Sequence, residues 1–453
     1  MLRRTDRGAV AVFLNLIQKR FNRFFIGRYN FDMKTVLLLL PAASYRNEDF
    51  LAAAKKLGVQ VIAVADYCPQ LAPGWGMGVL SAVHFDQPLL ATQTILEHLP
   101  SKPDAVLAVD DHGLELAAML REKLGLPGNS PAVVGLTRDK LAFRHLLQEQ
   151  GMLCPAFCNL ADDADAQYLG ELARQLSYPV VVKARRLSSS RGVIRANNAT
   201  EFLGAVRWVR AIQARVDRDS QELGLVVESF IPGREYALEG LLNKGVLQVL
   251  ALFDKPDPLD GPYFEETIYV TPSRLPAALQ AQIAEQVARA CRLAGLSSGA
   301  VHAELRINDQ GIWLLEVAAR SIGGLCGRML KHALGMSLEE VLLRHALGEA
   351  VPQAAAHGAS AVMMIPIPKR GIYQGVKGLN AALAVARIQS VLITAEVGAV
   401  LLPPPEGASY LGFIFAQADD AATAEFAVRE AHRRLAFEIQ TEVPLQVATS
   451  SAI

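Results

Sequence analysis

Residues 300–320 constrain the fold more than any other segment, because they read as two strands joined by a polar turn at residues 308–311. Side chains alternate between the two faces of a strand, so Glu304 and Glu316 each lie on a definite face. Pairing across so short a turn brings these two carboxylates close together. Adjacent carboxylates repel unless a cation lies between them, and oxygen ligands alone favour Mg²⁺ together with nucleotide phosphates. A solvated hairpin with incidental acids explains the same residues equally well.

Composition indicates a globular protein of several domains. At 453 residues the chain is long enough for two to four of them. Basic and acidic residues number 45 each, so no bulk charge favours nucleic acid or a membrane as a partner. No run of about 18 apolar residues is found, and we expect no transmembrane helix. The five cysteines lack the spacing of a zinc or redox pair, which favours reduced thiols and a cytoplasmic protein.

Residues 1–32 are basic around an apolar stretch at residues 9–17, and two interpretations stay open. A secretory signal or a basic amphipathic segment would have this charge pattern, but no convincing small-residue cleavage site follows. The favoured interpretation is a dispensable N-terminal extension, disordered or assigned to the chain in error. We therefore expect the first domain to begin at Met33, directly before an apolar strand.

From Met33 onward, apolar strands alternate with segments of helical periodicity. The strands are predicted at residues 36–40, 59–65 and 105–109, and the helices at residues 50–57 and 114–124. This alternation predicts a small parallel sheet covered by helices. The chain has no G-x-x-x-x-G-K-[ST] segment, which excludes a P-loop.

Basic and hydroxyl-bearing side chains gather in the middle of the chain. Thr137 is expected to cap a helix that carries Lys140. The strand at residues 178–183 ends on Lys183, and a lysine in so apolar a strand requires an anionic partner. The basic, serine-rich residues 185–193 that follow are suited to covering phosphates with hydroxyl and backbone N–H groups. Taken alone, such a segment is more often an ordinary loop.

In this order and spacing, the segments resemble the ATP-grasp superfamily over residues 126–328, and more loosely from Met33 onward. A strand, a turn at Pro232-Gly233 and a second strand within residues 225–239 belong to the same pattern. The resemblance implies a three-lobed fold of the α/β and α+β classes, with ATP held between the lid and the central lobe. The implied parts are an N-terminal parallel α/β domain at residues 33–135, ATP-grasp lid and central domains at residues 136–350 with the lid at about residues 160–230, and a small C-terminal α+β cap at residues 355–450.

The resemblance also implies roles for individual residues. The nucleotide would be held by Lys140, Lys183, Ser189, Ser190, Gly192, Val193, Glu228, Phe230, Ile231 and Glu235. Among these, the Glu228 hinge with the backbone of Phe230 and Ile231 would read the adenine, and Glu235 would bind the ribose. Glu304 and Glu316 would bind Mg²⁺ (or Mn²⁺), and Arg320 with Lys183 would steady the transferred phosphoryl group.

One position departs from the family pattern. The family usually reads Glu-x-Asn-x-Arg at the second strand of the hairpin, with the asparagine as a further metal ligand, whereas this chain has Ala318. The second Mg²⁺ is therefore expected to be bound more weakly, or to be completed by water, nucleotide or another side chain.

Residues 261–273 resemble the substrate-side strand of the L-amino acid ligase branch. Glu266 falls on that branch's amino-group-binding acid, Tyr269 replaces a more usual histidine, and Arg328 is a further candidate for the pocket. The resemblance implies an ATP-dependent carboxylate–amine ligase that forms an amide or peptide bond through an acyl phosphate. Its partners would be small-molecule acids and amines, amino acids above all, and a homodimer is the default expectation. The alternatives are a carboxylase-like or purine-pathway-like ligase and a non-catalytic ATP-binding regulatory protein.

Overall fold

The computed structural model describes residues 33–42, 44–66, 79–80, 83–216, 224–351 and 358–441. The expectation for residues 1–32 lies outside these described residues. The chain divides into two units, residues 1–128 with 342–350 and residues 129–341 with 351–453, and each is described by itself. None of the helices in the described part of the chain combines the length and apolarity needed to cross a membrane.

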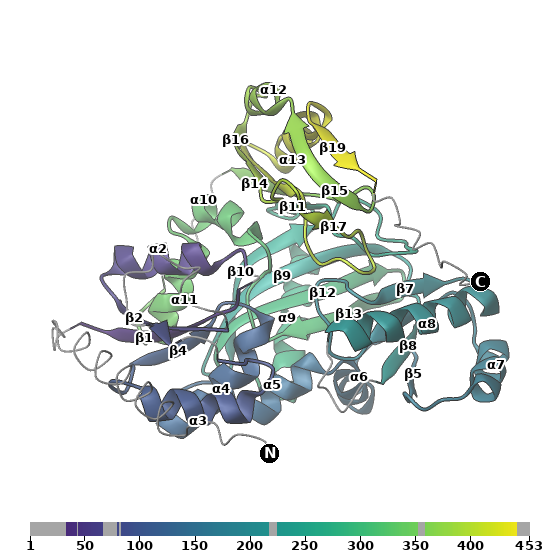
Figure 1. The fold of residues 1–453 in the computed structure, drawn as a ribbon, viewed down its shortest axis with the longest axis horizontal. Helices are drawn as coiled ribbons and strands as arrows, with labels where there is room; N and C mark the ends of the chain where they lie inside the picture. The colour runs from purple at the N-terminus through teal and green to yellow at the C-terminus, as the bar shows by residue number, and fades with distance from the viewer. Residues whose placement is uncertain are drawn as a thin grey trace, which may run out of the picture. The chain divides into compact units, whose positions relative to one another are not determined.

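The first unit contains a four-stranded parallel sheet in the order β3-β2-β1-β4 (Figure 1). Its strands are β1 (Thr35–Leu40), β2 (Gln60–Ala65), β3 (Val79–Leu80) and β4 (Ala105–Ala108), and its helices are α2 (Asn47–Leu57), α3 (Pro88–His98), η2 (Asp111–Gly113) and α4 (Leu114–Leu124). Every residue of β1 is buried, as expected for an inner strand covered on both faces. The prediction of a parallel α/β domain is confirmed.

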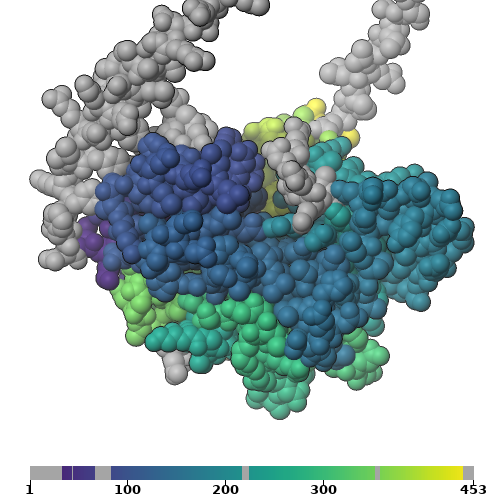
Figure 2. Space-filling model, turned by 90° about the horizontal axis from the view of Figure 1, so that it is seen from below, coloured from purple at the N-terminus to yellow at the C-terminus, as the bar shows by residue number. Residues whose placement is uncertain are grey.

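The second unit contains a separate antiparallel sheet in the order β5-β8-β6-β7, which we call the lid sheet. Its elements are β5 (Phe157–Leu160), α7 (Ala166–Gln175), β6 (Val180–Ala184), β7 (Val193–Ala196), α8 (Ala199–Val216) and β8 (Leu225–Ser229). Apolar side chains of α8, including Phe202 and Val206, pack with Val182 of β6 in one core. The segment is drawn in blue-green at the right of Figures 1 and 2.

An eight-stranded antiparallel sheet in the order β13-β12-β9-β10-β11-β14-β18-β16 forms the centre of the second unit. Its strands are β9 (Arg234–Asn243), β10 (Val246–Asp254), β11 (Ile268–Thr271), β12 (Gly299–Asn308), β13 (Gly311–Ala318), β14 (Ala359–Ile365), β16 (Ile388–Ile393) and β18 (Gly412–Ala418). Ile283 and Val287 of α9 (Ala277–Ala294) pack against the apolar side chains of β9, β12 and β13.

The strands that follow residue 350 continue this central sheet, because β14 pairs with β11. A smaller sheet in the order β17-β15-β19 and the helix α13 (Ala421–Arg433) accompany them. The other elements here are β15 (Gly371–Lys377), α12 (Leu379–Leu383), β17 (Val400–Leu401) and β19 (Ala436–Gln440), and η3 (Cys326–Leu330), α10 (Lys331–Leu334) and α11 (Leu338–Ala346) precede them. The C-terminal cap therefore shares a sheet with the central lobe, and the domain boundaries given above stay predictions.

The expected helix cap at Thr137 is wrong. Thr137 lies inside α5 (Pro131–Arg138), where its hydroxyl donates a hydrogen bond to the carbonyl of Val134. Asp139 caps the next helix, α6 (Lys140–Glu149), and its carboxylate accepts from the N–H groups of Leu141 and Ala142. Asp139 has the extended backbone that an N-cap requires, whereas the backbone of Thr137 is helical.

Candidate functional site

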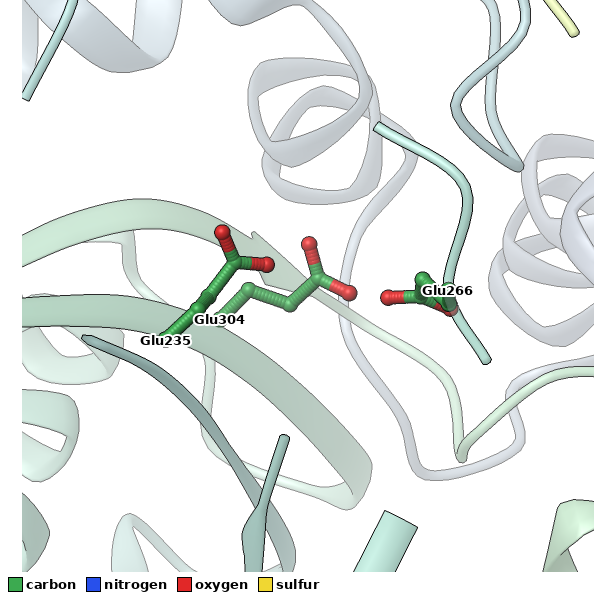
Figure 3. Close-up of side chains that lie close together, drawn as sticks. All are labelled: Glu235, Glu266 and Glu304. Carbon is green, nitrogen blue, oxygen red and sulfur yellow. The ribbon is translucent and has the colours of Figure 1, made fainter. Parts of the chain in front are cut away.

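A buried lysine, Lys255, lies among three carboxylates on the central sheet. Its Nζ donates hydrogen bonds to Glu266 at 2.5 Å, Glu235 at 2.9 Å and Glu304 at 3.1 Å. Glu235 belongs to β9 and Glu304 to the neighbouring strand β12, and Glu266 precedes β11. Figure 3 shows the carboxylates of Glu235 and Glu304 facing that of Glu266. No role for Lys255 was predicted, although it directly follows the apolar strand β10 (Val246–Asp254), and a lysine there requires an anionic partner.

Within the cluster around Lys255, the pKa of Glu304 is lowered and the pKa of Glu266 is raised. Burial alone raises the pKa of Glu304, but the charge of Lys255 and a hydrogen bond from His302 lower that pKa well below its usual value. Burial also raises the pKa of Glu266, and there the repulsion from Glu304 adds to it, so that the pKa is about 7 despite Lys255. Glu304 is therefore charged at neutral pH, whereas Glu266 is able to gain or lose a proton.

The three carboxylates have oxygen atoms within 4.8 Å of one another, a spacing that suits a divalent cation. The ammonium group of Lys255 lies at hydrogen-bonding distance from all three and neutralises them. We therefore regard Glu235, Glu266 and Glu304 as a lysine-centred cluster and not as a ready-made metal site.

The metal ligands predicted from the sequence, Glu304 and Glu316, lie directly opposite each other in the β12–β13 pair. Directly opposed residues of an antiparallel pair share one face of the sheet, so the expected proximity of the two acids is confirmed. The register shifts immediately beyond them, where Leu305 pairs with Leu314, and Leu315 is left as the extra residue of a β-bulge. The pair offers oxygen donors only, which suits Mg²⁺, and the metal-binding role itself stays a prediction.

A buried histidine extends the charged cluster along β12. His302 Nδ1 lies 3.1 Å from a carboxylate oxygen of Glu239, and its Nε2 lies 3.7 Å from Glu304. The same oxygen of Glu239 accepts a hydrogen bond from the N–H group of Ile322 in the loop after β13. Burial alone lowers the pKa of His302, but the bond to Glu239 and the nearby Glu304 raise it to about 9, so that the imidazole is charged at neutral pH.

The predicted adenine hinge contains a triad of ionisable side chains, in which Glu228 and Arg144 are buried and Lys183 is 13% exposed. Glu228 on β8 is 2.7 Å from Lys183 Nζ on one side and 2.8 Å from Arg144 Nε on the other. Burial alone raises the pKa of Glu228, but the two cations outweigh it and lower the pKa to about 2. The anionic partner that the sequence requires for Lys183 is thus Glu228.

The backbone of the hinge offers one hydrogen-bond donor. The N–H group of Phe230 already donates to the carbonyl of Pro179, and the carbonyl of Ile231 accepts from Arg306. Among the bonds of the described residues, none involves the N–H group of Ile231, so this group is available as a donor, and its role in binding adenine stays a prediction. Both carboxylate oxygens of Glu235 are engaged, by Lys255 and by Arg306, and a ribose hydroxyl would share one of them.

The predicted phosphate-covering loop joins β6 to β7. Ser189 and Ser190 both have positive φ values, 58° and 54°, a left-handed conformation that costs energy in residues other than glycine. Gly192 is also left-handed, and its N–H group donates to the carbonyl of Pro405, so it is not available to a phosphate in this arrangement. Val193 pairs with Lys183, and Lys140 Nζ donates to the carbonyl of Leu187 at 2.5 Å. Both lysines thus lie at this loop.

The predicted substrate residues are only partly brought together. The hydroxyl of Tyr269 donates to Glu266 at 2.7 Å, and Lys255 lies 5.2 Å from the centre of the Tyr269 ring. Arg320 lies in the loop after β13, where it donates to the carbonyl of Ser321, and Arg328 is an exposed residue of η3. Glu266 and Tyr269 therefore form one unit with the lysine-centred cluster, and the roles of the two arginines stay predictions.

Glu265, next to Glu266 of the lysine-centred cluster, is expected to make the stability of the protein depend on pH. Burial raises the pKa of Glu265 to about 7, against the effect of a hydrogen bond from the backbone of Ile367. Because the folded pKa lies above the value of 4.5 for the free side chain, the stability from this group is complete below pH 4.5 and is lost as the pH rises through 7. We expect Glu265→Gln to raise the melting temperature at pH 8 and to change it much less at pH 5. Glu285→Gln, at an exposed ion pair with Arg292, is the control, and equal melting curves for Glu265→Gln and wild type at pH 8 would refute the expectation.

Comparison with known proteins identifies two regions of the chain. Residues 176–329 match the family model of the ATP-grasp domain, and residues 363–440 match that of the L-amino acid ligase C-terminal domain 2. Carnosine synthase 1 of Gallus gallus is 30% identical over 278 residues, which are 58% of this chain and 30% of that protein. The D-alanine–D-alanine ligase of Stutzerimonas stutzeri is 27% identical over 267 residues, 56% of this chain and 80% of that protein. The match spans 30% and 28% of the length of the chicken and human carnosine synthases.

Solved structures extend the likeness to most of the fold. The L-amino acid ligase of Bacillus licheniformis has a TM-score of 0.77 and 26% identity, over 90% of this chain and 99% of that one. The biotin carboxylase domain of the Hydrogenobacter thermophilus 2-oxoglutarate carboxylase, solved with MgADP, has a TM-score of 0.67 at 17% identity over 90% of this chain and 91% of that one, and shares the fold alone.

Proposed function

The chain is an ATP-grasp protein with the C-terminal domain of the L-amino acid ligases, and from this premise we propose that it is an ATP-dependent carboxylate–amine ligase. The resemblance and the fold class expected from the sequence are thereby confirmed. The single observation that carries the proposal is the register of β12 and β13, which pairs Glu304 with Glu316 beside the cluster of Lys255. Cation-binding oxygens and a buried ammonium group on one sheet are what the transfer of a phosphoryl group requires.

In the proposed reaction, the chain first positions ATP. The N–H group of Ile231 would bind the adenine, and Lys183, held by Glu228, would meet the phosphates together with Lys140. Glu304 and Glu316 are the residues that would hold Mg²⁺, which when bound neutralises charge on the phosphate oxygens. Arg320 and Lys255 would add positive charge on the same side, and such electrostatic positioning supplies most of the catalysis of phosphoryl transfer.

The chemistry joins two substrates in two displacements. A carboxylate oxygen of the first substrate attacks the γ-phosphorus of ATP, the bond to ADP breaks, and an acyl phosphate forms. The nitrogen of the second substrate then attacks the acyl carbon, and inorganic phosphate leaves. Because an amine attacks only after losing its ammonium proton, a group able to accept that proton is required. Glu266, with a pKa of about 7 and a hydrogen bond from Tyr269, is the candidate.

Contacts with the C-terminal segment hold the loop at residues 188–193 in place, and such a loop would protect the acyl phosphate from hydrolysis by water. The N–H group of Gly192 donates a hydrogen bond to the carbonyl of Pro405. The next residue, Glu406, accepts a hydrogen bond of 3.3 Å from the indole N–H of Trp208 on α8. Arg370 donates to the other oxygen of Glu406 at 3.3 Å. The lid sheet is thereby held against the C-terminal segment, and closure of this kind excludes water from a reactive acyl phosphate.

A phosphate-release screen tests the proposal. Amino acids are supplied singly and in pairs with ATP and Mg²⁺, and release of ADP and phosphate is expected only when an acid and an amine are both present. Release that depends on bicarbonate would instead favour a carboxylase-like reaction. ATP binding without any acid-dependent hydrolysis would leave a regulatory nucleotide-binding protein. We further propose that the substrates are amino acids and that the protein acts in the cytoplasm. We propose a homodimer as its oligomeric state.

A further inference from the structure

One charged residue near the site has no part in the chemistry described above. Arg144 lies on α6, one turn after Lys140, and its side chain has 0% exposure. A guanidinium group is costly to bury, and it is retained in a core only where its contacts compensate for the lost hydration. The contacts of Arg144 therefore indicate what the residue does.

Arg144 joins two strands of different sheets. Its Nε lies 2.8 Å from Oε1 of Glu228, on β8 of the lid sheet. Its Nη2 donates a hydrogen bond of 2.6 Å to the carbonyl of Leu315, on β13 of the central sheet. Glu228 holds Lys183 through its second oxygen, so Arg144 and Lys183 share one carboxylate.

The carbonyl of Leu315 lies in the β-bulge directly before the predicted metal ligand Glu316. Leu315 is the extra residue of the β-bulge, and Glu316 follows it directly. β13 is the edge strand of its sheet, and it pairs only with β12 among the described strands. A bulge at an edge redirects the side chains beside it, so a bond that fixes the Leu315 carbonyl also fixes the direction of Glu316.

We infer that Arg144 is a positioning residue that couples the adenine hinge to the metal-binding hairpin. It holds Glu228, and through Glu228 the phosphate lysine Lys183, in a fixed relation to the bulge that aims Glu316. Binding of the nucleotide and binding of the divalent cation are therefore linked through its two contacts. The inference rests on the proposed function, which assigns the hinge and the hairpin to ATP and Mg²⁺.

The test measures ADP binding by calorimetry with and without Mg²⁺, and takes the ratio of the two dissociation constants as the coupling factor. For Arg144→Met we expect weaker ADP binding and a coupling factor reduced roughly 10- to 100-fold, the usual cost of losing a residue that orients a metal ligand. Glu228→Gln keeps the bond between Arg144 and Leu315 but removes the charge that holds Arg144 to the hinge, so it is expected to weaken ADP binding and to reduce the coupling factor as well. Loss of coupling in both variants is expected because the link needs both contacts of Arg144.

Two further variants separate positioning from general stability. Arg121→Met removes another largely buried arginine that donates to a strand carbonyl, that of Val106, and it is expected to leave the coupling factor unchanged. Arg144→Lys keeps a positive charge in the core but has one ammonium in place of a planar fork, so it is expected to fold and to lose the coupling. It serves as the test variant if Arg144→Met does not fold.

The outcomes are distinguishable. A coupling factor that is unchanged in Arg144→Lys or in Glu228→Gln overturns the inference and leaves the proposed function in place. Wild-type protein that binds no ADP removes the proposed function, and the inference with it.

Discussion

Glu316→Gln is expected to abolish turnover, lowering kcat by at least roughly 100-fold, because the amide keeps the shape of the side chain and removes its charge. Glu316 lies directly opposite Glu304, and these two are the acids that the paired strands of the hairpin offer to a cation. With Ala318 in the position where the family usually has an asparagine, no neighbouring amide compensates for the lost ligand. The measurement is phosphate release at saturating ATP with the best substrate pair from the screen.

The cation dependence adds a second criterion for Glu316. If the side chain binds a divalent ion, the residual activity of Glu316→Gln should require far more Mg²⁺ than the wild type and should rise when Mn²⁺ is added. Glu285→Gln, an exposed acid on α9 paired with Arg292, is the control for a general change of charge. Wild-type activity of Glu316→Gln at low Mg²⁺ would remove Glu316 from the set of metal ligands.

Lys255→Met is expected to cost about 3–5 kcal/mol of folding stability near pH 7, since it leaves one buried and two partly buried carboxylates without their cation. The lysine side chain is only 3% exposed and is bonded to Glu235, Glu266 and Glu304. Activity should be lost as well, even under conditions where the variant is folded. The measurement is urea unfolding at several pH values, together with phosphate release.

The sign of the pH effect for Lys255→Met follows from the carboxylates. In the wild type, the pKa of Glu304 lies well below its usual value of 4.5, so this acid contributes stability above pH 4.5 that is lost as the pH falls further. Without Lys255 this contribution disappears, and the deficit of the variant should be larger at pH 7 than at a pH well below 4.5. Added Mg²⁺ or Mn²⁺ should restore part of the stability, because the three oxygens within 4.8 Å then form a vacated cation site.

A matched variant keeps the Lys255 prediction specific. Lys377→Met breaks an exposed ion pair with Glu438, where the lysine side chain is 76% exposed, and it should leave the urea midpoint close to that of the wild type. Equal stability of Lys255→Met and wild type at pH 7 would show that the lysine-centred cluster does not hold the central sheet together.

The hairpin of residues 300–320 was predictable because all of its determinants are local. The polar turn and the alternation of side chains specify the pairing of Glu304 with Glu316, and the structure has that pairing. The bulge at Leu315 was not predictable, because nothing in the alternation of β13 marks one residue as extra.

The cluster of Lys255 could not be predicted from the sequence, although the lysine itself carries a signal. Like Lys183, it comes at the end of an apolar strand, and a lysine there requires an anion. Its partners are 20, 11 and 49 residues away, and they meet only because β9 lies between β10 and β12 in the sheet. Strand order at such separations depends on the packing of the whole lobe, which periodicity does not reveal.

The position of the helix cap also depended on a contact between residues distant in the sequence. Thr137 and Asp139 are both suitable N-cap residues, and they stand two positions apart. Asp139 is the N-cap because the chain leaves the helical conformation there between α5 and α6. Its carboxylate also forms an ion pair with Arg185, at the start of the predicted phosphate-covering loop. That second contact joins segments 46 residues apart and is invisible to a local pattern.

The continuous central sheet has a consequence for how such chains can diversify. The strand β11, which carries Tyr269, is hydrogen-bonded on its outer side to β14, with Tyr269 opposite Val362. A recombination event near residue 350 would therefore not exchange a self-contained module. It would replace the strand against which the substrate wall is built, or leave the edge of β11 with unpaired N–H and C=O groups that invite association with other chains. The lid sheet is a separate sheet whose strands, apart from an isolated bridge between Ile194 and Tyr263, pair with one another in the described structure, so it is the part that could be exchanged between relatives at less cost.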